Sequence, residues 1–73
     1  MPARLRDIKR ALEARGITVE TPPSGGSHYR ARKDSIVYPI PSHGGLKGEI
    51  NDIYIRGLCR RFGLDEDAFR RDL

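Results

Sequence analysis

The segment SHYRARKDSIVYPI, residues 27–40, has the pattern of a β-hairpin. Side chains of a strand alternate between its two faces, and the first half of this segment alternates histidine or arginine with tyrosine or alanine. The residues that share the polar face are His28, Arg30 and Arg32. Residues 35–40 are rich in β-branched and aromatic side chains, which favours a second strand after a tip at Lys33-Asp34. We therefore predict two antiparallel strands whose basic face points away from the core.

A helix and a strand are predicted ahead of the hairpin. Leu5, Ile8 and Leu12 recur at spacings of three and four, as the buried face of an amphipathic helix requires. Gly16 is a typical stop for such a helix. Residues 17–20 then alternate apolar with polar side chains and end before two prolines, which is the pattern of a half-buried strand. With this strand, the predicted sheet has three strands.

Two helices are predicted after the hairpin. The first runs from about Lys47 to Phe62 and is expected to be the main core helix. Its broad apolar arc consists of Ile50, Ile53, Tyr54, Gly57, Leu58 and Phe62. On the same helix we expect Ile55 at the edge of the arc, where it is available to a partner or to the core, and Cys59 toward the polar side. Asp65 is a suitable N-cap for a last short helix.

In chain order these elements predict an α+β fold, with a helix, a three-stranded antiparallel sheet, a helix and a short C-terminal helix. They form one domain, residues 1–73. A chain of this length buries a limited core, so we expect any active site to be shallow.

The composition is basic, with 14 Lys and Arg against 10 Asp and Glu and a net charge of +4. This suits a nucleic-acid partner, although many small proteins are equally basic. The single cysteine excludes an intrachain disulfide and indicates a reducing compartment. Cys59, His28 and His43 lack the paired spacing of metal ligands, so we expect no metal and no cofactor. No apolar run reaches the length of a membrane span or a signal peptide, and the expected location is the cytoplasm.

Four short motifs follow one another along the chain. They are Gly26-Ser27-His28, Tyr38-Pro39-Ile40-Pro41-Ser42-His43, Leu46-Lys47-Gly48-Glu49-Ile50 and Phe62-Gly63-Leu64-Asp65-Glu66-Asp67-Ala68-Phe69. In this order and spacing, the chain resembles the HicA family of small mRNA-cleaving toxins. The resemblance implies a fold like that of double-stranded-RNA-binding domains, metal-independent endoribonuclease activity on mRNA, and a HicB-like antitoxin as partner. It also implies that His28 is the catalytic histidine, and we expect the chain alone to be a monomer.

The chemistry of RNA cleavage agrees with a histidine in this role. RNA carries its own nucleophile, the 2′-hydroxyl, so an enzyme has to remove that proton, stabilise the charged phosphorane and protonate the leaving oxygen. Imidazole, with a free pKa of about 6.5, can accept or donate a proton near neutrality. His28 is therefore the candidate general acid or base. His43 is either a secondary acid or base or a brace for the loop ahead of the long helix.

The candidate RNA-binding residues are close to His28 in sequence or precede the long helix. They are Gly26, Ser27, Arg30, Arg32 and Lys47. Arginine and lysine suit phosphate contacts, and glycine and serine add backbone or hydroxyl donors. The alternative is a solvated charged face, in which case the chain is a non-catalytic RNA-binding module or a domain that binds an acidic protein.

Overall fold

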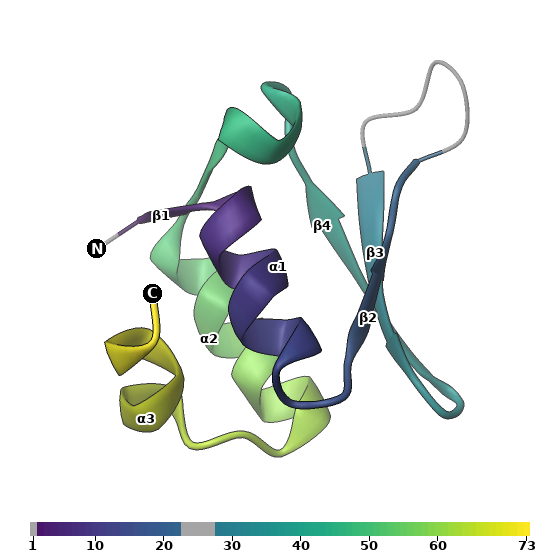
Figure 1. The fold of residues 1–73 in the computed structure, drawn as a ribbon, viewed down its shortest axis with the longest axis vertical. Helices are drawn as coiled ribbons and strands as arrows, with labels where there is room; N and C mark the ends of the chain where they lie inside the picture. Colours follow the sequence, from purple (N-terminus) through teal and green to yellow (C-terminus); the bar gives the residue numbers. More distant parts are fainter. Residues whose placement is uncertain (1, 23–27) are drawn as a thin grey trace.

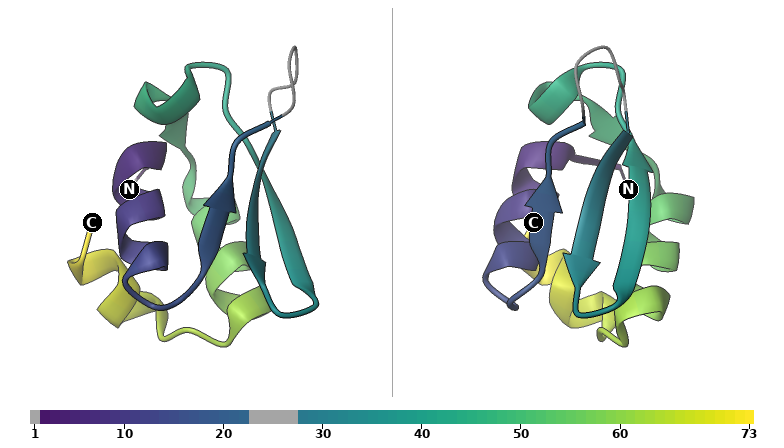
Figure 2. Two further views of the ribbon diagram at one scale, coloured as in Figure 1. Left: turned by 45° about the vertical axis from the view of Figure 1, so that its right-hand side comes forward. Right: turned by 90° about the vertical axis from the view of Figure 1, so that its right-hand side faces the viewer.

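The structure is a computed structural model that describes residues 2–22 and 28–73. Its elements are β1 (Ala3–Arg4), α1 (Leu5–Glu13), β2 (Thr18–Glu20), β3 (His28–Lys33), β4 (Ile36–Pro41), the 3₁₀ turn η1 (Gly45–Lys47), β5 (Glu49–Ile50), α2 (Asp52–Phe62) and α3 (Glu66–Arg71). Helices α1 and α2 lie on one face of the sheet β2-β3-β4, and α3 packs beside them (Figures 1 and 2). The predicted α+β class and the predicted order of a helix, three strands, a helix and a short helix are confirmed.

The predicted hairpin forms β3 and β4, and β3 is the central strand of the antiparallel sheet. At its start His28 is the register partner of Pro41. Tyr29 and Ala31 are buried on the inner face, as the alternation predicts. The exposed basic residues of the outer face are His28, Arg30 and Arg32. The tip includes Asp34, whose φ of 54° is in the left-handed region that tight turns require.

The inner face of the sheet and the two long helices enclose one apolar core. The three α1 residues predicted from the sequence, Leu5, Ile8 and Leu12, are fully buried. Full burial of one such side chain contributes roughly 1.5–3 kcal/mol, so α1 is held mainly by this face. The chain leaves α1 at Gly16, with φ at 79°, and turns back into β2.

The long helix begins later than the sequence predicted. Its first residue is Asp52 rather than Lys47, because η1 and then β5 occupy the preceding residues. β5 pairs with β1, and this contact between distant parts of the sequence is not visible in any local pattern. Asn51 then caps the helix, with its Oδ1 accepting a hydrogen bond from the Tyr54 backbone N–H at 3.1 Å.

The buried face of α2 also differs from the predicted arc. Ile53 was expected to be buried but is 77% exposed. Ile55, expected at the edge, is fully buried, and Cys59, expected toward the polar side, is only 2% exposed. The physical reason is helical periodicity: the buried Ile55, Leu58 and Cys59 recur at spacings of three and four, and Phe62 continues this face. Phe69 of α3 is buried in the same core.

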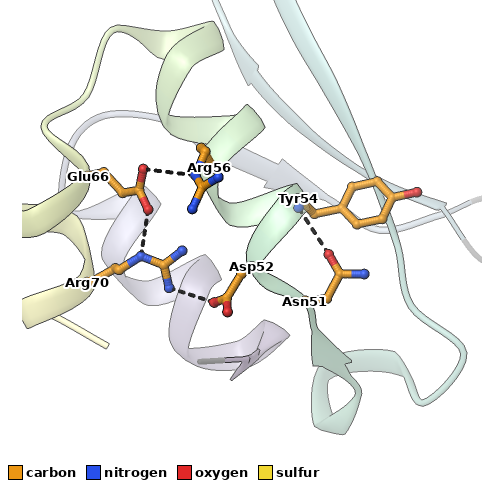
Figure 3. A network of polar contacts seen from close by, with 6 residues as sticks. All are labelled: Asn51, Asp52, Tyr54, Arg56, Glu66 and Arg70. Carbon is orange, nitrogen blue, oxygen red and sulfur yellow. Dashed lines mark hydrogen bonds and ion pairs between the residues drawn. The ribbon is translucent and has the colours of Figure 1, made fainter.

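A polar network fixes α3 to α2 (Figure 3). Arg70 donates from Nη1 to Asp52 Oδ1 and from Nε to Glu66 Oε2, both at 2.9 Å. Arg56 Nε lies 3.7 Å from the other carboxylate oxygen of Glu66. Arg70 therefore bridges the start of α2 and the first turn of its own helix.

Candidate functional site

His28 is the first residue of β3, and its side chain is exposed on the outer face of the sheet. No hydrogen bond or ion pair joins its imidazole to any other residue that the structure describes. Both ring nitrogens are therefore open to a substrate. Gly26 and Ser27, the donors predicted just ahead of His28, lie outside the described residues, and their roles stay predictions.

Two arginines follow His28 on the outer face, and the structure distinguishes them. Arg32 donates from Nε to Glu20 Oε2 at 3.0 Å. Arg30 is the register partner of Glu20, yet it forms no ion pair within the described part of the chain. An exposed ion pair is worth only about 0–1 kcal/mol, so a phosphate can compete for Arg32. Arg30 is the more available cation, and it lies closer to His28 along the strand.

The loop after β4 is fixed by Ser42. This serine is buried, and its Oγ donates to the carbonyl oxygen of Gly45 at 2.6 Å. A Cβ built on Gly48 would overlap Ser42 Oγ, so any side chain at that position would displace the serine hydroxyl. His43 is exposed and has no hydrogen bond to the rest of the described chain. Ser42, which sequence analysis did not single out, is therefore the residue that braces the loop.

Lys47 is the last residue of η1, and its side chain is exposed. η1 and the beginning of β3 lie at the same end of the molecule (Figure 1). The side chain of Tyr29, on the inner face of β3, reaches η1, since a Cβ built on Gly45 would lie 3.5 Å from the Tyr29 hydroxyl. Lys47 therefore belongs to the same end of the molecule as His28, but η1 contacts β3 through Tyr29, whose side chain lies on the face opposite His28.

A shallow hollow of about 340 Å³ lies at this end of the molecule. Its lining consists of Pro41, His43, Glu49, Ile50, Asn51 and Tyr54. Pro41 is also the register partner of His28, so one residue links the hollow to the candidate catalytic strand. Sequence analysis missed Tyr54 as a surface residue because it placed the ring in the core, whereas Tyr54 is 37% exposed.

A larger hollow of about 660 Å³ is lined by residues of β1, α1, β5, α2 and α3 and includes the Arg70 network. Its charged lining residues are Arg4, Asp7, Glu49, Asp52, Arg56, Glu66 and Arg70. The hydrogen bond to Glu66 raises the pKa of Arg70, and the one to Asp52 raises it further. Four of these residues, Asp52, Arg56, Glu66 and Arg70, are joined by ion pairs that connect α3 to α2, which indicates a structural role for them.

Cys59 does not provide a nucleophile. Burial raises the pKa of its thiol, and the nearby Glu66 carboxylate raises it further. The thiolate, which is the reactive form, is therefore disfavoured. Within residues 2–22 and 28–73, no group of three or more His, Cys, Asp or Glu side chains is arranged to hold a metal ion.

Comparisons of the chain with protein-family models, with curated proteins and with solved structures give no match. In the part of the chain that the structure describes, no helix has the length and apolar character needed to cross a bilayer.

Proposed function

We propose that this chain is a metal-independent endoribonuclease that cleaves mRNA, like the HicA toxins that it resembles in sequence. The observation that carries the proposal is the exposed imidazole of His28 at the start of a basic strand face, with the open cation Arg30 next on that face. We also propose that the fold is related to that of double-stranded-RNA-binding domains and that the protein acts in the cytoplasm.

In the proposed reaction, His28 accepts the proton of an RNA 2′-hydroxyl. The freed oxygen attacks the adjacent phosphorus, and the bond from phosphorus to the 5′-oxygen breaks. Arg30 stabilises the charge that develops on the phosphorane oxygens. The leaving 5′-oxygen takes a proton from His43 or from water, and His43→Ala distinguishes these two sources. The products are a 2′,3′-cyclic phosphate and a 5′-hydroxyl.

The proposed protein partner is a HicB-like antitoxin with an acidic surface. Such a partner would cover His28 and neutralise the outer face, which would stop cleavage by excluding RNA. Electrostatic complementarity of this kind weakens with salt. Complex formation that is unaffected both by high salt and by charge reversal at Arg30 and Arg32 would count against this mode of inhibition.

Cleavage and binding have to be measured together, because a non-catalytic RNA-binding module could present the same basic face. Purified protein is incubated with an mRNA in EDTA, and cleavage is followed on a gel while binding of the same RNA is followed by a mobility shift. We expect cleavage in EDTA. RNA that is bound but stays intact would contradict the enzyme and support the binding module, and RNA that is neither bound nor cleaved would point to a protein partner alone.

A further inference from the structure

The hollow beside Pro41 has the chemistry of a site for one RNA base. We propose that it binds the base of a nucleotide next to the cleaved phosphodiester, with the Tyr54 ring as its stacking surface. This inference rests on the proposed ribonuclease function and adds a subsite to it. Its volume of about 340 Å³ is near the lower end of the range of small-ligand sites, which suits a single base rather than a larger ligand.

Tyr54 is placed to stack rather than to fill the core. The residue is 37% exposed, although its backbone is held by the cap from Asn51. In Figure 3 the Tyr54 ring and the Asn51 amide project to the same side of α2, away from the network of Asp52 and Arg70. Because the backbone of Tyr54 is already fixed, stacking on its exposed ring costs little conformational entropy. An aromatic face can stack with any base.

The hollow also offers polar groups for the edge of a base. The Asn51 side chain uses its oxygen in the helix cap, which leaves its amide N–H groups as donors. Glu49, on the same lining, supplies carboxylate acceptors. A donor and an acceptor beside a stacking ring match the mixed edges that bases present.

The position of the hollow relates it to the proposed reaction. Pro41 lines it and is the register partner of His28 on the outer face. His43, the only other imidazole of the chain, lines it as well. A base held here would therefore place its own sugar and phosphate at the end of the strand that carries His28.

The test measures binding of fluorescent ten-nucleotide adenylate, cytidylate and uridylate RNAs to His28→Ala protein, in which the RNA stays intact. Adding Tyr54→Ala should weaken binding by roughly 5- to 150-fold, the effect of losing one stacked base. Tyr54→Phe in the same background keeps the ring, so it should bind RNA with the affinity of the His28→Ala protein. The loss should be the same at low and high salt, because Tyr54 neutralises no phosphate. Ile53→Ala, at the exposed neighbouring position of α2, is the matched control and should leave binding unchanged.

Unchanged binding in Tyr54→Ala, or equal losses in Tyr54→Ala and Tyr54→Phe, would overturn the subsite. The native protein, assayed in parallel, keeps the two proposals separate. If it cleaves RNA while the Tyr54 variants bind normally, the ribonuclease stands and the subsite fails. If it neither binds nor cleaves RNA, both fail.

Discussion

Gly57 lies against the hydroxyl of Tyr38, where α2 meets the sheet. A Cβ built on Gly57 would overlap that oxygen and lie 3.2 Å from the ring carbon that bears it. Burial raises the pKa of Tyr38, in agreement with a hydroxyl held in a confined position. The absence of a side chain at position 57 therefore determines how closely the helix approaches β4.

We expect Gly57→Ala to destabilise the protein. Overpacking costs roughly 1–3 kcal/mol, which exceeds or offsets the gain of about 1 kcal/mol from the better helix propensity of alanine. Urea unfolding measures the difference. Adding Tyr38→Phe removes the overlapping oxygen and should recover part of the loss. A Gly57→Ala protein more stable than the native chain would show that the two elements are not this close.

The thiol of Cys59 makes stability depend on alkaline pH. Its ordinary pKa is 9.0, and burial raises the value in the folded state. The folded chain therefore holds this proton more tightly than the unfolded chain does. The resulting stabilisation is complete below pH 9.0 and is lost as the pH rises from there through the folded pKa.

We expect the free energy of unfolding in urea to fall more steeply between neutral pH and about pH 10 in the native protein than in Cys59→Ala. Tyr38, whose pKa is also raised, is present in both proteins and serves as an internal control. Parallel pH profiles for the two proteins would contradict the burial of the thiol.

Side-chain positions were predictable from the sequence in the strand but only in part in the long helix, where Leu58 is buried as predicted and Ile53 is not. A strand has only two faces, so the alternation from His28 to Arg32 correctly separated exposed from buried residues. In α2, Ile55 is followed by Leu58, Cys59 and Phe62 at helical spacings, whereas Ile53 is followed at the same spacings by Arg56, Gly57 and Arg60. The apolar stripe of Ile55 is therefore the buried one, and the predicted arc was rotated away from it. Tyr54 was missed as a candidate surface residue because it belongs to the misplaced part of that arc.

At the scale of elements, the short helix α3 begins as its sequence predicted. The Asp65 carboxylate accepts a hydrogen bond from the Ala68 backbone N–H at 3.1 Å. An N-cap satisfies one of the four amide groups that a helix leaves without partners at its start. This matters most in a helix of only six residues.

We expect Asp65→Ala to lower the free energy of unfolding by about 1 kcal/mol, the typical value of an N-cap. Asp65→Asn keeps an oxygen that can accept the same bond and should stay close to the native value. Urea unfolding of the three proteins provides the comparison. An asparagine variant as unstable as the alanine variant would show that charge, rather than the cap, is what matters.

The pair β1–β5 is the element that the sequence could not reveal. Each strand has two residues, too few to show an alternation, and the partners are far apart in the sequence. Glu49 and Ile50 form β5, so the buried Ile50 belongs to a strand and not to the predicted helix. The start of α2 was predicted too early for this reason.

At the scale of the whole molecule, pairing between elements determines which cations are available. Arg15 contacts Asp72 at 2.6 Å and lies over the Phe69 ring, so part of the basic N-terminal half is neutralised by the C-terminal helix. Arg30 has no such ion pair in the described chain. The net charge of +4 alone does not show this difference.

RNA binding should therefore depend on position as well as charge. Arg30→Ala and Lys33→Ala each remove one cation from β3, at the middle and at the hairpin end. We expect Arg30→Ala to reduce the slope of log affinity against log salt by about 1 and Lys33→Ala to change it less. Fluorescence anisotropy across a salt series measures both slopes. Equal changes would indicate a diffuse charge effect in place of a defined phosphate contact.

The central claim is that His28 activates the 2′-hydroxyl of RNA, and one cleavage assay tests it most directly. Native protein and His28→Ala, both shown to be folded by circular dichroism, are incubated in EDTA with an RNA and with its all-deoxy counterpart. We expect the native protein to cut only the RNA, leaving 2′,3′-cyclic phosphate ends, and His28→Ala to be slower by roughly 10²- to 10⁴-fold. Cleavage of RNA by His28→Ala at the native rate, or cleavage of the deoxy strand, would contradict the account.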